Sequence, residues 1–236
     1  MKKIKAILWD FDGTMLDSTI ESMNNMLWVA EQLRFKIPSI ELMQKYWGIT
    51  WLKFIDKIAY DCDWEEGSTK LFVEKCKENN HLWRTHKLFE ETKETLEILV
   101  SQGIKIGIVS TRIRESAGKD LFSIMDYFKI LDIDSNMFFI IQGQEDCPFK
   151  KPDPEVFDSA MELLAKKGIN PEEVIYVGDT LHDFRAATNY IPSIFFVAID
   201  SGACDRRTFL QKGVFQECII NSPREIFSAI NFLENL

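Results

Sequence analysis

The chain has 236 residues, 46% of them hydrophobic and 28% charged, which is ordinary for a globular protein and enough for a core domain plus a smaller one. The net charge of −9 argues against nucleic acid or an anionic membrane as the main partner, because both bind basic faces. No apolar run is long enough to span a bilayer, and the stretch after Lys3 is too short for a signal peptide. We therefore expect a cytoplasmic protein with no membrane partner.

The first expected strand covers residues 4–9 and ends in Asp10 and Asp12, followed by Gly13. Two carboxylates one residue apart repel each other, and each shifts the pKa of the other. A cation or a shared proton relieves that repulsion, so the pair predicts a metal site, a carboxylate nucleophile, or both. The alternative is an ordinary junction between a strand and a turn, because Asp and Gly are common turn residues.

Residues 17–90 contain no convincing strand. Met23, Met26 and Ala30 fall on one face of a helix, and later apolar residues continue the helical spacing. All of the tryptophans except Trp9 also lie in this stretch, where a small helical module needs large apolar groups for its own core. We expect residues 17–90 to form a helical cap inserted after the first strand.

Short apolar runs, rich in β-branched and aromatic residues, alternate with helical patterns over the rest of the chain. The strands are expected at residues 104–109, 138–141, 174–177 and 193–197, and the helices at residues 92–101, 114–125, 154–166 and 181–190. This alternation predicts an α/β fold, a doubly wound parallel sheet with helices on both faces. Residues 1–16 and 91–236 are expected to form this core.

Polar residues follow the ends of these strands, and in a parallel sheet the strand ends meet at one edge. Besides the first pair of aspartates, they are Ser110, Thr111, Lys151, Asp179 and Asp183. Carboxylates, a hydroxyl and a lysine suit Mg²⁺ and a phosphate group. Each residue also has a purely structural explanation: a helix N-terminal acid for the aspartates, a cap for the serine and a solvated lysine, with Lys150 as a rival.

Four segments carry the same pattern in the same order. They are DFDGTMLDS at residues 10–18, VST at 109–111, KPDPE at 151–155 and VGDTLHD at 177–183. Together they resemble the motifs of the haloacid dehalogenase superfamily, in its phosphoglycolate phosphatase-like branch. The helical insertion after the first motif likewise resembles the C1-type cap of that family.

The resemblance implies roles for individual residues. Asp10 would attack phosphorus and form an aspartyl-phosphate, and Asp12 would protonate the leaving oxygen and later take a proton from water. Mg²⁺ would be the cofactor. The implied metal ligands are Asp10, Asp12 through its backbone carbonyl, Asp179 and Asp183, and the implied phosphate-binding residues are Ser110, Thr111 and Lys151.

Substrate selection is expected to lie in the cap. Trp47, Gly48 and Thr50 belong to a glycine turn between aromatic residues, which resembles the specificity loop of the family, and Arg84 is a further candidate for a substrate anion. Arg112 is interpreted as a surface arginine in preference to a substrate contact.

These observations predict a Mg²⁺-dependent phosphatase that hydrolyses a small phosphorylated metabolite, a phosphoglycolate-like compound, a nucleotide or a sugar phosphate. A phosphosugar mutase of the same superfamily is one alternative, and a binding module without turnover on the same fold is another. The protein is expected to be a monomer or a homodimer.

Overall fold

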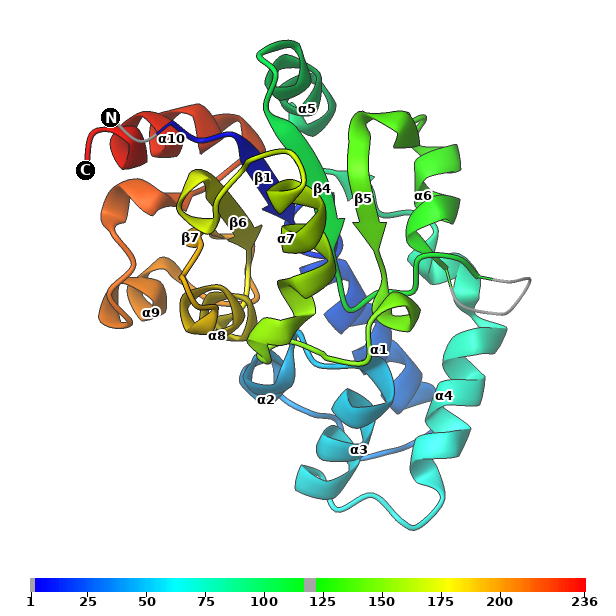
Figure 1. Ribbon diagram of the computed structural model, residues 1–236. Helices are drawn as coiled ribbons and strands as arrows, with labels where there is room; N and C mark the ends of the chain where they lie inside the picture. The colour runs from blue at the N-terminus through cyan, green and yellow to red at the C-terminus, as the bar shows by residue number, and fades with distance from the viewer. Residues whose placement is uncertain (1–2, 117–121) are drawn as a thin grey trace.

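The computed structural model describes residues 3–116 and 122–236, and a parallel sheet runs through its centre (Figure 1). The sheet has six strands in the described residues, in the order β5-β4-β1-β6-β7-β8, and every neighbouring pair is parallel. The strands are β1 (Ala6–Trp9), β4 (Lys105–Val109), β5 (Phe138–Gln142), β6 (Val174–Gly178), β7 (Phe195–Ile199) and β8 (Ile219–Ile220). Every residue of β1 and β6 is buried, as expected for apolar strands covered on both faces.

Helices cover both faces of this sheet and complete a doubly wound α/β fold. They are α5 (Thr92–Ser101), α6 (Ile124–Ile130), α7 (Asp158–Ala165), α8 (Leu181–Asn189), α9 (Arg206–Gln211) and α10 (Ile226–Glu234). In Figure 1, α7 and α8 lie in front of the sheet, and α8 packs on β6 and β7 while α5 packs on β4. Short 3-10 helices join them at Ser135–Met137, Gln144–Asp146, Pro154–Phe157, Pro171–Glu173, Gln216–Cys218 and Pro223–Glu225.

The order of the strands reverses between β1 and β6. From β1 the chain first builds outward to β4 and β5, and then returns to place β6 on the other side of β1. In open sheets of this kind, ligands bind outside the carboxyl ends of the strands at the point of reversal. The residues that directly follow β1 and β6 are Asp10 and Asp179.

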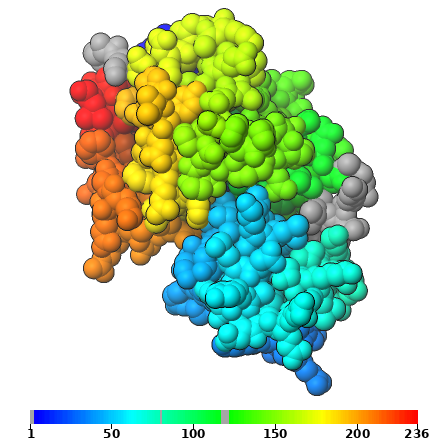
Figure 2. All heavy atoms as spheres, turned by 60° about the horizontal axis from the view of Figure 1, so that its bottom comes forward, coloured from blue at the N-terminus to red at the C-terminus, as the bar shows by residue number. Residues whose placement is uncertain are grey.

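A second group of helices packs over this end of the sheet. They are α1 (Thr19–Gln32), α2 (Ile40–Tyr46), α3 (Trp51–Asp61), α4 (Ser68–Glu78) and a 3-10 helix at Asn80–Trp83. Figure 2 shows the cyan atoms of this region seated against the yellow and green atoms of the sheet layer. Their apolar residues, including Met23, Phe54 and Phe72, form a buried cluster separate from that around the sheet. We therefore propose residues 17–90 as the cap and residues 1–16 and 91–236 as the core.

A two-stranded antiparallel ribbon joins the two regions. It pairs β2 (Leu16–Asp17) with β3 (Lys87–Leu88), so the chain enters and leaves the helical region at one place. Near the exit, Glu91 has a φ of +61°, a left-handed conformation that glycine usually supplies. The sequence did not predict this ribbon or β8, because strands of two residues are too short to show an alternating pattern.

The helix expected at residues 114–125 is wrong. Residues 112–116 are not helical, and α6 begins only at Ile124; residues 117–121 of that prediction lie outside the described residues. The side chain of Ser123 accepts a hydrogen bond from the backbone N–H of Asp126 at 3.1 Å, and the Asp126 carboxylate accepts one from the Ser123 N–H at 3.0 Å. This capping box sets the start of the helix.

Among the described residues, no helix has both the length and the apolar character that crossing a bilayer requires.

Candidate active site

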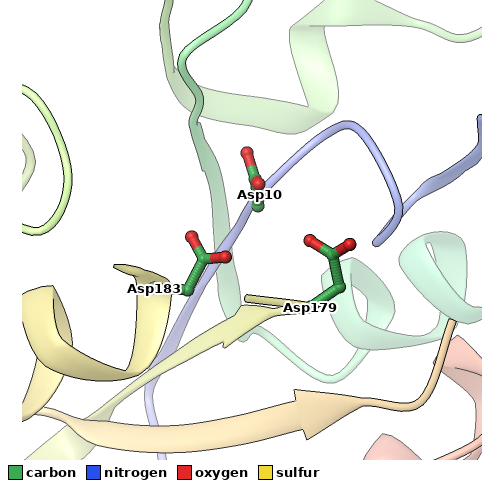
Figure 3. A group of neighbouring side chains, drawn as sticks. All are labelled: Asp10, Asp179 and Asp183. Atoms are coloured by element: carbon green, nitrogen blue, oxygen red, sulfur yellow. The ribbon is translucent and has the colours of Figure 1, made fainter. Parts of the chain in front are cut away.

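Three aspartates from separate segments meet at the carboxyl edge of the sheet. Asp10 follows β1, Asp179 follows β6, and Asp183 lies in the first turn of α8, as Figure 3 shows. All three are buried, and each offers an oxygen that lies within 4.8 Å of the others. The parallel pairing of β1 with β6, which places Trp9 beside Val177, brings the first two together.

This group of aspartates fits a divalent cation. Asp10 Oδ1 and Asp179 Oδ1 are buried and have no hydrogen-bond partner in the described structure. The backbone turns tightly beside them at Gly13, with a φ of +70°, and a Cβ added there would come within 2.1 Å of Asp179 Oδ2. Buried carboxylate oxygens without donors are costly unless a cation compensates them, and carboxylates are ligands that Mg²⁺ prefers.

The electrostatics of the aspartates agree with this interpretation. Burial raises the pKa of Asp10 to about 6, although Lys151 opposes the shift. Burial and the nearby charges of Asp183 and Asp10 raise the pKa of Asp179 well above its usual value. Both shifts arise chiefly because burial disfavours the charged carboxylate, and a bound cation would offset that cost.

Lys151 is the cation that the chain itself places in this group. Its Nζ lies 3.0 Å from Asp10 Oδ2 and 2.6 Å from Asp183 Oδ1, and it also donates to the Tyr176 hydroxyl at 2.9 Å. Burial alone would lower the pKa of Lys151, but the two aspartates raise it, so the ammonium stays charged. Lys150 points elsewhere and donates to the backbone carbonyls of the loop before it.

Asp183 is held rigidly by the start of α8. Its Oδ2 accepts hydrogen bonds from the backbone N–H of Thr180 at 3.0 Å and from the Thr180 hydroxyl, while the Asp183 N–H donates to that hydroxyl at 3.2 Å. This capping box leaves Asp183 fully buried and off the wall of the cavity described below. Burial would raise the pKa of Asp183, but Lys151 holds it below its usual value.

Asp12 is not part of this group of three aspartates and is clamped by Arg112. The guanidinium donates from Nε to Asp12 Oδ2 and from a terminal nitrogen to Asp12 Oδ1, both at 2.7 Å, and Ser18 donates to Oδ1 at 2.9 Å. Burial would raise the pKa of Asp12, but Arg112 and Ser18 hold it below its usual value. Arg112 also donates to the carbonyl of Phe122 at 2.6 Å and lies over the Tyr127 ring.

The prediction that Arg112 is an ordinary surface arginine is therefore wrong. Its side chain is only 17% exposed, and its partner Asp12 lies 100 residues away in the sequence. Sequence reasoning also missed Tyr176, whose buried hydroxyl joins Lys151 and Asp183, and Ser18 as a partner of Asp12. The only sequence signal for Arg112 was its position two residues after Ser110, which shares the edge of the sheet.

A cavity of about 210 Å³ opens beside the aspartates and extends into the cap. Asp10, Asp12, Asp179 and Thr111 form part of its wall. Ser110 is buried behind this wall, where its Oγ accepts a hydrogen bond from the backbone N–H of Arg112 at 3.2 Å. The structure thus brings the expected catalytic, metal and phosphate residues to one place, with Asp12 turned toward the arginine.

The expected specificity residues divide into two pairs. Trp47 and Gly48 line the cavity, and a Cβ added to Gly48 would come within 2.9 Å of Thr180 Cγ2, so this loop of the cap rests on the core. Thr50 precedes α3 and Arg84 lies with its guanidinium over the Phe122 ring; neither is part of the cavity wall in the described residues.

A doubly wound sheet with buried carboxylates at its point of reversal defines an α/β protein with an acidic site at the carboxyl edge of its sheet. A family model described as haloacid dehalogenase-like hydrolase matches residues 7–197. The chain therefore belongs to the haloacid dehalogenase-like hydrolase family, and its relatives include proteins named pyrophosphatase and phosphoglycolate phosphatase.

Two relatives and one solved structure illustrate this membership. The chain is 30% identical to pyrophosphatase PpaX of Halalkalibacterium halodurans over 79% of its own length and 80% of the relative. It is 28% identical to phosphoglycolate phosphatase of Aquifex aeolicus over 78% and 79% of the two chains. The crystal structure of a haloacid dehalogenase-like hydrolase from Bacteroides fragilis is 25% identical, with a TM-score of 0.74 over 95% of this chain and 100% of the other.

Proposed function

We propose that the protein is a Mg²⁺-dependent phosphatase that hydrolyses a small phosphorylated metabolite in the cytoplasm through an aspartyl-phosphate on Asp10. The observation that carries this proposal is the position of Asp10. Its carboxylate lies on the cavity wall, is paired with Lys151 at 3.0 Å, and keeps Oδ1 without a hydrogen-bond partner beside Asp179. A carboxylate held in this way has one oxygen oriented by a cation and lies open to a substrate phosphorus.

Mg²⁺ would be held by Asp10, Asp179, Asp183 and the backbone carbonyl of Asp12. When bound, it supplies positive charge against the phosphoryl oxygens and the carboxylates. The buried position of Asp179 and Asp183 supports this assignment, because neither has a basic partner other than Lys151 within the described site.

Asp10 would attack phosphorus, with its second oxygen oriented by the Lys151 ammonium. Lys151 would also restrain the charge that develops on the non-bridging oxygens, together with the hydroxyls of Ser110 and Thr111. Thr111 lies on the cavity wall, which supports a direct contact with the phosphate. Ser110 and Lys151 lie just behind it and are 6% and 3% exposed.

Asp12 would transfer the protons of the reaction. Because Arg112 and Ser18 lower its pKa, Asp12 would first take a proton from solvent, and it would then give that proton to the leaving oxygen in the first step. In the second step it would take a proton from the attacking water. Arg112 and Ser18 together fix the direction of its carboxylate. Arg112 would thus act as a positioning residue, since its guanidinium is occupied by Asp12 and by the carbonyl of Phe122.

The proposal is tested by measuring release of inorganic phosphate from a panel of phosphate monoesters, with Mg²⁺ and with EDTA. We expect hydrolysis that depends on Mg²⁺ and that Asp10→Asn abolishes, because the amide is a poor nucleophile. Full activity of Asp10→Asn would contradict the mechanism. An isomerised sugar phosphate without free phosphate would show a mutase, and inactivity toward the whole panel would indicate a binding module.

A further inference from the structure

The cavity wall contributed by the cap is mostly apolar and rich in aromatic residues. Trp47, Trp51, Phe54 and Trp83 line it from the cap, and Phe122 closes it from the core. Aliphatic and sulfur-containing side chains of α1, α4 and the loop before α3 form much of the remaining cap wall, together with Ser22 and Lys77. The acidic residues and Thr111 occupy the opposite end. A ligand that reaches Asp10 therefore has to place its remaining atoms among ring faces.

The aromatic side chains are held in a fixed arrangement. Trp51 and Phe54 are stacked, with ring centroids 6.1 Å apart and an interplanar angle of 11°. Trp47 meets the same Phe54 edge-on at 5.5 Å and 90°. Gly48, between the two tryptophans, approaches Thr180 so closely that a Cβ would lie 2.9 Å from Thr180 Cγ2. The contact of this loop with the core sets the rings opposite the aspartates.

Basic side chains are scarce on this wall. Arg112 is one, and its guanidinium is already bound to Asp12 and to the Phe122 carbonyl. The other basic residue among the described lining is Lys77, an exposed residue of α4. A leaving group with its own carboxylate or phosphate would meet aromatic faces here, and desolvating such a charge is unfavourable.

We propose that this cavity binds the leaving group of a phosphate monoester that carries one flat, apolar ring. This inference rests on the proposed phosphatase function and names its substrate class. An apolar cavity of ~150 Å³ is enough to hold benzene. The volume of about 210 Å³ therefore has room for a single ring beside the end that receives the phosphoryl group.

The test compares benzyl phosphate with ethyl phosphate and phosphoglycolate, all of which are esters of primary alcohols. We expect kcat/KM for benzyl phosphate to exceed that for ethyl phosphate by about tenfold to a hundredfold, the effect of burying one aromatic ring. Phosphoglycolate, which has a charged leaving group, is expected to be the poorest of the three.

Trp51 is the residue to change, with Trp28 as its control. Trp51→Ala removes one wall, so the preference for benzyl over ethyl phosphate should fall by about threefold to tenfold. Trp51→Phe retains an aromatic ring and should keep most of the preference for benzyl phosphate. Trp28 is an exposed cap tryptophan, 39% accessible on α1 and outside the cavity lining, so Trp28→Ala should leave the ratio unchanged.

The outcomes separate this inference from the function on which it rests. A preference of the unmodified protein for phosphoglycolate or ethyl phosphate over benzyl phosphate would overturn the inference and leave the phosphatase intact. Failure to hydrolyse any ester in the presence of Mg²⁺ would overturn both. Because the first comparison needs no variant, it decides the matter even if Trp51→Ala does not fold.

Discussion

On the core side of the cavity several side chains are charged and held by ion pairs, whereas on the cap side the side chains are mostly apolar and are held by packing, with Lys77 as the charged residue among the described lining. Lys151 joins Asp10 and Asp183, and Arg112 joins Asp12, through ion pairs of 2.6–3.0 Å. The cap residues meet through ring contacts such as that of Trp47 with Phe54. Charged groups with fixed partners suit a single reaction, and an apolar wall sorts substrates by shape and polarity.

The largest of these effects is expected when the core loses Lys151, the lysine behind the cavity wall. Lys151→Met leaves Asp10 and Asp183 buried without their cation, so kcat should fall by about a hundredfold to a thousandfold. The folded state should lose about 3 kcal/mol or more, because an unpaired buried charge remains. Steady-state kinetics and urea unfolding measure the two effects.

The control for this variant is Lys150→Met. Lys150 bonds only backbone carbonyls of its own loop among the described contacts and faces none of the aspartates. The Lys150→Met variant should keep its kcat within about twofold of that of the unmodified protein. If both variants lost activity equally, the pairing of Lys151 with Asp10 would not explain the effect.

Mg²⁺ binding is expected to depend on the aspartates of the core and not on the cap. Saturating Mg²⁺ should raise the melting temperature of the unmodified protein by several degrees, since a ligand at ~100 times its Kd stabilises by ~2.7 kcal/mol. Asp179→Asn should remove most of this shift, because it takes away a ligand oxygen that has no other partner. Asp146→Asn, which alters an aspartate paired with Arg114 outside the group, should retain it. Thermal scans with and without EDTA check both, and a full Mg²⁺ shift in Asp179→Asn would remove this residue from the metal site.

The clamp on Asp12 gives a smaller, kinetic effect. Arg112→Gln should lower kcat by about tenfold to a hundredfold with little change in KM, since Asp12 keeps its carboxyl group but loses its orientation. Arg112→Lys should fall in between, because an ammonium cannot form the two parallel bonds.

Arg114→Gln serves as the control for the clamp. Arg114 pairs with Asp146 and Glu115, away from the cavity, and should have kinetics close to those of the unmodified protein. An increase in KM alone in Arg112→Gln would instead mean that Arg112 binds the substrate directly.

The smallest effect concerns the contact of the cap with the core at Gly48 and Thr180. Gly48→Ala and Gly67→Ala place a Cβ on glycines of similar backbone, with φ of +91° and +85°. At Gly67 nothing lies within 4 Å, whereas at Gly48 the new atom would press on Thr180. Both should lose about 1 kcal/mol of stability, but only Gly48→Ala should also raise KM, by a few-fold. Equal KM values for the two variants would show that the contact with Thr180 does not control access to the cavity.

The charged half of the cavity could be predicted from the sequence because its residues follow strand ends. Asp10, Ser110 and Asp179 each come directly after a short apolar run, and parallel strands bring their carboxyl ends to one edge. Asp183 and Lys151 have fixed positions relative to that edge, one in the first turn of a helix and the other just before one. Local pattern and sheet topology were therefore sufficient to group them.

Contacts between distant segments could not be predicted in this way. The pairing of Arg112 with Asp12 depends on the path of residues 112–116. The sequence predicted a helix from residue 114, whereas the structure shows no helix over residues 112–116. In the sequence Tyr176 is one residue of an apolar strand. In the structure its hydroxyl lies between Lys151 and Asp183. Such pairs leave no periodic pattern, because each is made by one side chain reaching one partner.

The sequence by itself determined the class of fold, the alternation of the main strands and helices, and most of the residues that meet at the edge of the sheet. It did so because these features depend on hydrophobic periodicity and on residues next to strand ends. Only the tertiary structure decided that Arg112 clamps Asp12, that Gly48 rests on Thr180, and that aromatic side chains form the wall opposite the aspartates. The first of these joins two distant segments of the core, and the other two arise where the cap packs on the core. All three depend on side chains that lie far apart in the sequence.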